Sequence, residues 1–272
     1  MFYLIGLGLS DAKDVSVRGL EIIKSAEKVF LEAYTSVLLC PKSELEEFYG
    51  RTDIIEADRT MVEQQSDLIL EKASTADVCF LVVGDPLSAT THTDLILRCK
   101  EKNIKFRTIH NASIMNAIGC TGLHLYNFGE TVSVVFWEDN WKPTSYFDKI
   151  LRNLENNYHT LCLLDIKMKE QTTENLMKGN NIFEPPRWMT VQDCCQQFLE
   201  ILEMDEKYKN CTITPDTIVV GVSKVGSDKQ KIYCASIRKM AEGNYLGEPL
   251  HSMVVTNGNL HDIEKQYLEM YM

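Results

Sequence analysis

The chain has 272 residues, which is enough for one large domain or two medium ones with a substantial core. It is 44% hydrophobic and 25% charged, the composition of an ordinary globular protein. The formal net charge of −11 argues against a nucleic-acid partner, because phosphate binding needs concentrated lysine and arginine. No apolar stretch approaches the length of a transmembrane helix, so no membrane partner is expected.

The number and spacing of the cysteines indicate the cellular compartment of the protein. There are nine, scattered without C-x-x-C spacing, and most of them lie in apolar runs. An odd number in this arrangement favours a reducing compartment over a disulfide framework. The first residues, MFYLIGLGL, lack the basic start of a secretory signal and run into an acidic stretch. These features predict a cytoplasmic protein.

In the first half of the chain, apolar strands alternate with segments of helical spacing. Strands are expected over 2–8, 28–31, 53–56, 78–83, 105–109 and 131–137, and helices over 15–26, 43–49, 61–73, 91–102 and 113–120. The run 78–83 is apolar throughout, as in a parallel strand covered on both faces, and the spacing of Thr91 and Asp94 suggests a capping box for the helix that follows. The alternation predicts an α/β domain, residues 1–137, with a mainly parallel sheet.

The regular alternation of strands and helices ends at a polar linker, 138–144. The expected elements there are a helix over 145–156, a strand over 159–166, a helix over 191–203, strands over 217–223, 231–236 and 251–256, and a short helix over 237–242. Short connections between strands favour antiparallel pairing, because a parallel pair needs a long crossover. The sequence therefore predicts a second α/β domain, residues 138–272, with a mixed sheet.

Familiar catalytic motifs are missing. Gly6-Leu7-Gly8 begins like a dinucleotide fingerprint, but Asp11 occupies the position of the third glycine, although Glu32 follows the second strand at about the expected distance. The chain has no P-loop, no Gly-x-Ser-x-Gly elbow and no His-Glu-x-x-His motif. This pattern favours chemistry in which a cofactor supplies the reactive group and the protein supplies positioning.

Three loops at the ends of expected strands carry the remaining pattern: 6–9 (GLGL), 84–88 (GDPLS) and 110–114 (HNASI). The carboxyl edge of a parallel sheet is where ligands bind in α/β folds. Together and in this order, the loops resemble the cofactor-binding loops of the tetrapyrrole-methylase-type methyltransferases. Members of that group have two α/β domains and use S-adenosylmethionine (SAM).

Longer stretches are similar to the diphthine synthases of that group, especially the eukaryotic ones. They are MFYLIGLGLSDAKDVSVRGLE, FLEAYTSVL, FLVVGDPLSATTHTDL, IHNASIMNAIGCTGLHLYNFGETVSVVFW, HTLCLLDIKMKEQ, EPPRWM and GEPLHSMVVT. The resemblance covers nearly the whole chain and is weakest between Glu203 and Thr214.

The resemblance implies an activity and its partners. The family binds SAM in a cleft between its two domains and acts as a homodimer. Its substrate is elongation factor 2, at a histidine that already carries an aminocarboxypropyl group. Methyl groups go to the amino nitrogen, giving a trimethylammonium, and in eukaryotic members the carboxylate is also converted to a methyl ester.

The resemblance also implies a set of cofactor-binding residues, carried over position by position: Leu9, Asp85, Ser88, Ser113, Ile114, Leu164, Val225 and His251. Two places depart from the family. Ser88 stands where relatives often have glycine or valine, and Ser223-Lys224 replaces Ala-Arg. The second change keeps the positive charge but loses the planar fork of arginine.

The expected roles follow from chemistry. Aliphatic side chains such as Leu9 and Leu164 would pack the carbon skeleton of SAM, Asp85 would accept hydrogen bonds from its amino or hydroxyl groups, and backbone groups at Ser113 and Ile114 would hold its polar ends. No catalytic base is assigned. Asp165 and His110 are candidates, with a structural role favoured for both.

A protein acceptor also needs a docking surface. The loop 184–189 (EPPRWM) combines a rigid Pro-Pro pair with Arg187 and Trp188, residue types favoured at binding hot spots. We expect this loop to contact elongation factor 2, and a packed structural loop is the equal alternative.

Three other functions remain open from the sequence. The first is a methyltransferase of the same fold that acts on a small tetrapyrrole in a closed apolar cleft. The second is a protein that binds SAM without catalysis, which differs in transferring no label. The third is a nicotinamide-dependent oxidoreductase, which would show a spectral change when the nicotinamide is added.

Overall fold

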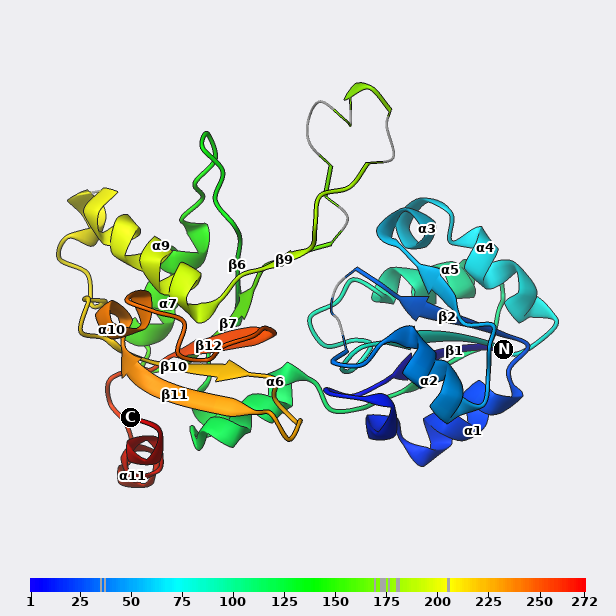
Figure 1. Cartoon of the computed structure of the whole chain (residues 1–272), viewed down its shortest axis with the longest axis horizontal. Coiled ribbons are helices and arrows are strands. Elements are labelled where there is room, and N and C mark those ends of the chain that lie inside the picture. Colours follow the sequence, from blue (N-terminus) through cyan, green and yellow to red (C-terminus); the bar gives the residue numbers. More distant parts are fainter. Residues whose placement is uncertain are drawn as a thin grey trace. The chain divides into compact units, whose positions relative to one another are not determined.

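A computed structural model gives the fold and describes residues 1–34, 36, 38–168, 170–171, 175, 177–179, 182–204 and 206–272. The chain divides into two compact units, Met1–Ala117 and Ile118–Met272. Figure 1 labels most of the elements of both. Within the described ranges, no helix combines the length and apolarity needed to cross a membrane.

The described residues of the first unit, all but 35 and 37, form five strands and six α-helices. They are β1 (Phe2–Gly6), α1 (Val17–Ser25), β2 (Lys28–Glu32), α2 (Lys42–Tyr49), β3 (Ile55–Ala57), α3 (Arg59–Gln64), α4 (Asp67–Leu70), β4 (Val78–Val82), α5 (Thr93–Glu101), β5 (Phe106–Ile109) and α6 (Ile114–Ala117). The strands form one sheet in the order β3-β2-β4-β1-β5, and every neighbouring pair is parallel. The expected parallel sheet is confirmed.

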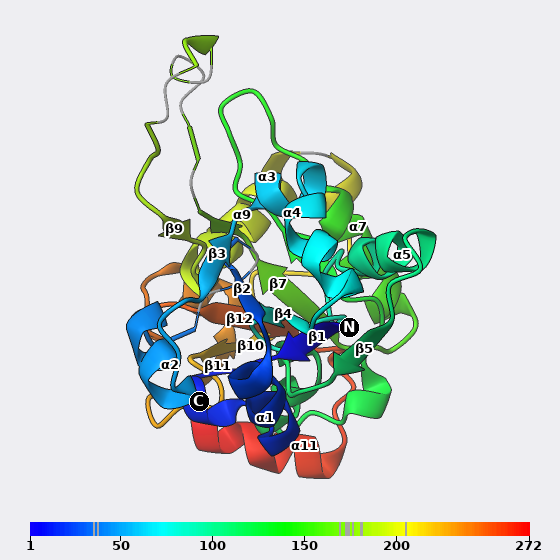
Figure 2. The ribbon, with the colours of Figure 1, turned by 90° about the vertical axis from the view of Figure 1, so that its right-hand side faces the viewer.

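Two apolar layers cover this sheet. Alternate residues of β4 point to opposite faces: Cys79 and Leu81 pack with side chains of α1 and α2, whereas Val78, Phe80 and Val82 pack with those of α3, α4 and α5. Figures 1 and 2 show these two groups of helices on opposite faces of the sheet. All five residues of β4 are fully buried, which explains why its sequence is apolar without alternation.

Two expected helices in this unit differ in detail. The expected helix over 61–73 is divided into α3, α4 and a 3-10 turn. The expected capping box at the start of α5 is wrong. The helix begins one residue later than a Thr91 cap would require, and its N-cap is His92 without a side-chain hydrogen bond. Asp94 instead pairs with Arg98 one turn along, at 2.7 Å.

The second unit contains a five-stranded sheet, a short ribbon and four described α-helices. They are β6 (Val132–Val134), α7 (Ser145–Glu155), β7 (Thr160–Leu164), β8 (Ile166–Lys167), β9 (Arg187–Trp188), α9 (Val191–Met204), β10 (Ile218–Ser223), β11 (Lys231–Ser236), α10 (Ile237–Ala241), β12 (His251–Val255) and α11 (Asp262–Leu268). Short 3-10 helices also occur in both units. In the first unit they are η1 (Ala12–Asp14) and η2 (Glu71–Ser74), and in the second they are η3 (Ile118–Thr121), η4 (Leu125–Asn127), η5 (Glu206–Tyr208) and η6 (Glu269–Tyr271).

The second sheet has the order β11-β10-β12-β7-β6. Only β6 and β7 are parallel, and the other pairs are antiparallel, so the expected mixed sheet is confirmed. Its core packs side chains of α7, α9 and α10 against one face of the strands, with Phe147 and Phe198 edge to face at 5.2 Å between ring centroids. Strands β8 and β9 form a separate two-stranded ribbon.

The division between the units differs from the expected one. The expected first domain ran to residue 137 and included the strand over 131–137. That strand, β6, is hydrogen-bonded to β7 in the second sheet. The compact units therefore meet in the chain at Ala117, before β6. Sequence spacing alone does not reveal which sheet a strand joins, because the partner strand decides this.

Candidate functional site

The three expected loops meet at one edge of the first sheet. Strands β4, β1 and β5 are neighbours and parallel, so their carboxyl ends lie together. The chain leaves β1 towards β2 on one side and leaves β4 towards β5 on the other. Such a change of direction opens a crevice at the carboxyl edge, the usual ligand position in open α/β sheets.

Glycines allow the loop backbones to approach closely. A Cβ added at Gly6 would lie 2.6 Å from the Gly84 carbonyl oxygen and 2.8 Å from the Asn111 Cβ, so no larger side chain fits. Beyond it, Gly8 and Gly84 exchange two backbone hydrogen bonds, of 3.2 and 2.7 Å. Gly84 has a φ of +77°, which glycine adopts without steric cost. The first two loops are thus joined main chain to main chain.

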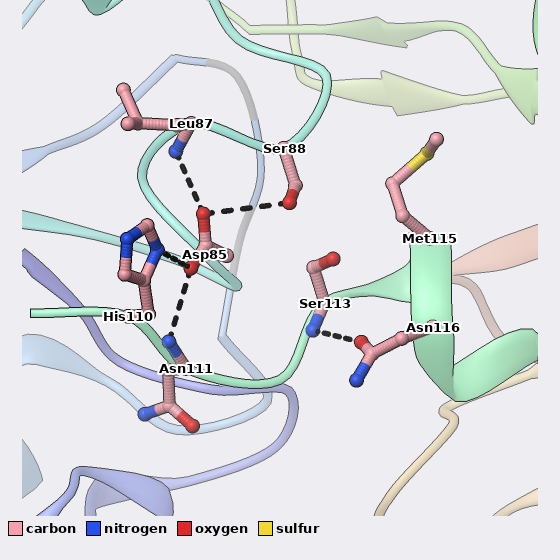
Figure 3. A pocket seen from close by; sticks show the side chains of 8 residues that line it. All are labelled: Asp85, Leu87, Ser88, His110, Asn111, Ser113, Met115 and Asn116. Atoms are coloured by element: carbon pink, nitrogen blue, oxygen red, sulfur yellow. Dashed lines mark hydrogen bonds and ion pairs between the residues drawn. The ribbon is translucent and has the colours of Figure 1, made fainter.

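Asp85 joins the second and third loops, as Figure 3 shows. Its Oδ1 accepts hydrogen bonds from the Leu87 N–H at 2.9 Å and the Ser88 hydroxyl at 3.4 Å. Its Oδ2 lies 2.7 Å from His110 Nδ1 and accepts a hydrogen bond from the Asn111 N–H at 3.1 Å. A carboxylate offers about four lone-pair sites, so these contacts use nearly all of its capacity.

The charge of Asp85 is stabilised by these contacts. Only 6% of the residue is exposed, and burial by itself raises the pKa of its carboxyl group. The hydrogen bonds from Leu87, His110 and Asn111 outweigh that effect, and the net result is a pKa below the ordinary value. Asp85 is therefore an ionised, nearly saturated acceptor that connects the second loop to the third.

Asn111 is a functional candidate that the sequence did not single out. Its side-chain nitrogen donates to the backbone oxygens of Gly6 and Asp14, both at 2.9 Å. Its side-chain oxygen accepts from the Ala112 N–H at 2.7 Å. It thereby ties the third loop to the first, as Asp85 ties it to the second. The available indication was its place directly after a strand, next to His110.

A pocket of about 350 Å³ opens beside these loops. Its lining residues are Asp85, Leu87, Ser88, His110, Asn111, Ser113, Met115 and Asn116. The Ser113 hydroxyl points towards the space that Ser88 and Met115 border, while its N–H donates to Asn116 at 2.8 Å (Figure 3). The wall thus combines two hydroxyls with apolar side chains. This volume lies within the range of small-molecule sites, about 300 to 1,000 Å³.

Leu9 and Ile114 lie on the same edge but are not among the lining residues of this pocket. Both are half-buried. The Leu9 N–H donates to the Asp14 carboxylate at 3.2 Å, and Ile114 is the first residue of α6. Of the five candidates in the first unit, the structure therefore brings Asp85, Ser88 and Ser113 into one pocket and leaves the other two beside it.

The remaining candidates lie together on one edge of the second sheet. Leu164 is the last residue of β7, and His251 is the first residue of the antiparallel neighbour β12. His251 is also the register partner of Ser223, the last residue of β10. Val225 follows two residues later in the turn to β11. Residues far apart in the sequence thus reach the same edge of this sheet.

His251 is held as a neutral ring. Its Nδ1 accepts a hydrogen bond from the Val191 N–H at 3.3 Å, and its Nε2 lies 3.2 Å from the Glu248 carbonyl oxygen, which fixes the Nε2–H tautomer. Burial lowers the pKa of the imidazole, and it outweighs the backbone contacts that raise it. Its ring therefore links β12 to the start of α9.

The two candidate bases are both in structural contacts. Asp165 Oδ2 accepts from the Phe136 N–H at 3.0 Å and lies 3.6 Å from Lys167 Nζ. His110 Nδ1 faces the Asp85 carboxylate, while 67% of its side chain is exposed. Neither arrangement singles out a group for proton transfer, so no base is assigned.

The glycine pair at the amino terminus does not continue as a dinucleotide site. Asp11 caps the 3-10 helix η1 by accepting from the Lys13 N–H at 2.8 Å. Glu32, buried at the end of β2, accepts from the Tyr34 N–H at 3.1 Å. Both carboxylates are thus used to shape their own loops.

Comparison with known proteins identifies relatives over the whole chain. The family model described as Tetrapyrrole (Corrin/Porphyrin) Methylases matches residues 1–241. A diphthine methyl ester synthase from Homo sapiens is 54% identical over 272 residues, which are 100% of this chain and 95% of the human protein. One from Aspergillus fumigatus is 53% identical over 271 residues, 100% of this chain and 93% of that protein.

A solved structure gives the same result for the fold. The crystal structure of a candidate diphthine synthase from Entamoeba histolytica superposes with a TM-score of 0.86 and 45% sequence identity. The match covers 100% of this chain and 98% of that one.

Proposed function

Because this chain is a methyltransferase that belongs to the tetrapyrrole methylase family, and within it to the diphthine methyl ester synthases, we propose that it uses SAM to methylate elongation factor 2. The acceptor is the histidine that already carries an aminocarboxypropyl group. The amino nitrogen becomes a trimethylammonium, and the carboxylate becomes a methyl ester. This reaction belongs to diphthamide biosynthesis.

The observation that carries the proposal is the junction of three loops around Asp85. The residues present suit SAM: glycines bring bare backbone to the rim, Ser88 and Ser113 offer hydroxyls, and Leu87 and Met115 offer apolar surface. When bound, SAM supplies a methyl carbon activated by its sulfonium. The protein needs to align that carbon with the acceptor, and alignment provides most of the acceleration in such a displacement.

The roles within this site are specific. Asp85 and Asn111 hold the three loops in one arrangement, because each makes hydrogen bonds to more than one loop. Ser88, Ser113, Leu9 and Ile114 remain proposed SAM contacts on the first unit. Leu164, Val225 and His251 remain proposed SAM contacts on the second unit. No residue is proposed as the base, because solvent can take the proton of the amine.

The acceptor protein is proposed to dock on loop 184–189. Arg187 and Trp188 form β9, which is labelled in Figure 1 and pairs with β8 in the ribbon. The Arg187 guanidinium lies 4.5 Å from the centre of the Phe136 ring and its Nε lies 3.0 Å from Glu170. The side chain is still 47% exposed, so a partner could contact it.

The deciding experiment mixes the purified protein with methyl-labelled SAM and elongation factor 2, with or without the aminocarboxypropyl group. We expect label and a matching mass gain only on the modified factor. Label on a small tetrapyrrole instead would favour the alternative that the sequence left open, a methyltransferase of the same fold that acts on such a compound. SAM binding without label on any acceptor would contradict catalysis and leave the non-catalytic alternative.

We also propose a homodimer in the cytoplasm. All nine cysteines are free, as expected for a protein of a reducing compartment. The homodimer rests on the family resemblance, and sedimentation should give twice the chain mass.

A further inference from the structure

A second pocket, of about 480 Å³, lies in the second unit between two turns. One turn, 224–230, connects β10 to β11, and the other precedes β12. Its lining residues are Lys224, Asp228, Lys229, Gln230, Lys231, Leu246, Gly247 and Glu248. The pocket lies at the sheet edge that carries Val225 and His251, yet none of its lining residues was a candidate for SAM.

Both turns are held by hydrogen bonds within the turn. In the first, Lys224 has a φ of +50°, its carbonyl oxygen accepts the Ser227 hydroxyl at 2.8 Å, and the Gln230 side chain accepts the Gly226 N–H at 2.9 Å. In the second, Asn244 makes hydrogen bonds of 3.0 and 2.7 Å to the N–H and carbonyl of Gly247. The backbone that carries the charged side chains is therefore preorganised by these bonds.

The charges of this pocket are unusual for an acidic chain. Three lysines, Lys224, Lys229 and Lys231, line it, and among the described residues none of them forms an ion pair with a carboxylate within 4.0 Å. Lys231 Nζ lies 3.5 Å from the position of a Cβ at Gly247, so the lysine covers that turn. Asp228 and Glu248 line the same pocket, which leaves an excess of one positive charge.

This combination selects a class of ligand. An excess of one positive charge suits a monoanion such as a carboxylate better than a polyphosphate, which needs several cations. The two acidic side chains can in turn accept hydrogen bonds from an ammonium group. A group that carries one carboxylate and one ammonium, the head of an α-amino acid, satisfies both sets.

We propose that the pocket lined by Lys224, Lys229, Lys231, Asp228 and Glu248 binds the α-amino-acid head of a reactant. The identity of that reactant rests on the proposed function. Under that function, two reactants present such a head: the aminocarboxypropyl group of the acceptor and the methionyl end of SAM. Esterification of the acceptor removes its negative charge, so a lysine-lined pocket that held the acceptor would bind the ester more weakly.

The test compares a Lys229→Gln/Lys231→Gln double variant with the wild type. If the lysines hold the acceptor carboxylate, their loss in the variant should raise the KM for modified elongation factor 2 about tenfold, with kcat and the Kd for SAM nearly unchanged. If the lysines hold SAM, their loss should instead raise the Kd for SAM by a similar factor, which calorimetry measures. Unchanged KM and Kd would overturn the proposal.

Controls separate this outcome from other failures. Lys100→Gln, an exposed lysine of α5 outside both pockets, removes one charge and should change neither constant. Asp228→Asn should weaken binding in the same direction, since it removes the partner of the ammonium group. Melting curves show whether each variant is folded.

A direct probe keeps the inference apart from the proposed function. L-Methionine carries the α-amino-acid head, and its titration should shift the NMR signals of turns 224–230 and 246–248. The double variant should lose those shifts. If the wild type transfers no label to elongation factor 2 but shows these shifts, the proposed function is wrong and the proposal that this pocket binds an α-amino-acid head is supported. Absence of the shifts would overturn the pocket.

Discussion

At the residue scale, Asp85 and Asn111 illustrate how single side chains assemble a binding edge. Each side chain contacts two separate loops, so their effect depends on the fold that brings the loops together. The sequence identified Asp85 as a direct acceptor for the cofactor. In the structure its oxygens are already engaged by four groups of the protein, so we infer that it acts mainly by positioning the loops.

Replacing Asp85 tests this role. Asp85→Ala should weaken SAM binding about 10- to 100-fold, because hydrogen bonds to a charged acceptor contribute about 1.5 to 3 kcal/mol each and the loops lose their common anchor. Asp85→Asn should also weaken it, since its amide group would face N–H donors. Calorimetry gives the affinity, and Asp53→Asn, at an exposed carboxylate outside the pocket, is the matched control. An unchanged affinity in Asp85→Ala would contradict the role.

At the element scale, the site depends on how closely strand ends approach. The carboxyl ends of β1 and β4 are joined through their glycines, and β5 is joined to both through side chains. The β8–β9 ribbon is a different kind of element, because it is short and its two charged residues, Lys167 and Arg187, both pair with Glu170, which follows β8. The strand ends therefore lead to a prediction about the cofactor site, and the ribbon leads to a prediction about the docking of the acceptor protein.

Gly6→Ala should damage the cofactor site from within. The new methyl group would lie 2.6 Å from the Gly84 oxygen, so the loops must move apart. Overpacking of this kind costs about 1 to 3 kcal/mol of the free energy of unfolding, and SAM binding should fall as well. Gly243→Ala, whose Cβ would have no neighbour closer than 3.8 Å, should behave like the wild type. Denaturant titration and calorimetry measure the two effects, and equal behaviour of both variants would reject the prediction.

Loop 184–189 makes the prediction for the acceptor. Arg187→Ala and Trp188→Ala should raise the KM for modified elongation factor 2 about tenfold, as expected for interface hot spots, while SAM binding stays unchanged. Arg152→Ala, at an exposed arginine of α7, removes the same charge elsewhere and should have no such effect. Wild-type kinetics in both loop variants would remove the loop from the proposed docking surface.

At the scale of the whole molecule, three buried histidines couple folding to pH. Burial lowers the pKa of His92, His159 and His251, and in each case it is the largest effect. His92 Nδ1 lies 3.3 Å from the Pro86 carbonyl oxygen in loop 84–88, and His251 is the first residue of β12. His159 contacts the buried Glu264 at 3.4 Å. All three are neutral in the folded protein at pH 7.

The sign of the pH dependence follows from linkage. In the unfolded chain a histidine has a pKa of about 6.5, so below that value the unfolded state binds more protons than the folded one. The stabilisation is complete above about pH 6.5 and is lost as the pH falls towards the lower folded pKa values. Each histidine can contribute up to about 1.4 kcal/mol per pH unit. Carboxylates with lowered pKa, such as Asp85, act only at more acidic pH.

Urea midpoints at pH 7.5 and 5.5 test this prediction. We expect a lower midpoint at pH 5.5, and a smaller difference in His92→Gln, which cannot titrate in this range. A midpoint that does not change between the two pH values would contradict the prediction.

The sequence by itself determined the fold class and the loops that matter. Apolar runs without alternation identified covered parallel strands, and short connections identified antiparallel ones, because both patterns reflect local burial and chain length. The turn residues of loops 6–9, 84–88 and 110–114 were visible for the same reason. Strand β6 was visible as a strand, but not as a member of the second sheet.

Only the tertiary structure decided which residues meet. The bridging by Asn111, the saturation of Asp85 and the pocket of lysines all depend on contacts between segments distant in the chain, such as Asn111 and Gly6. Sequence spacing determines which side chains share a helix or strand face. It does not determine which loop ends become neighbours, because that depends on strand order, and strand order is set by packing of the whole unit.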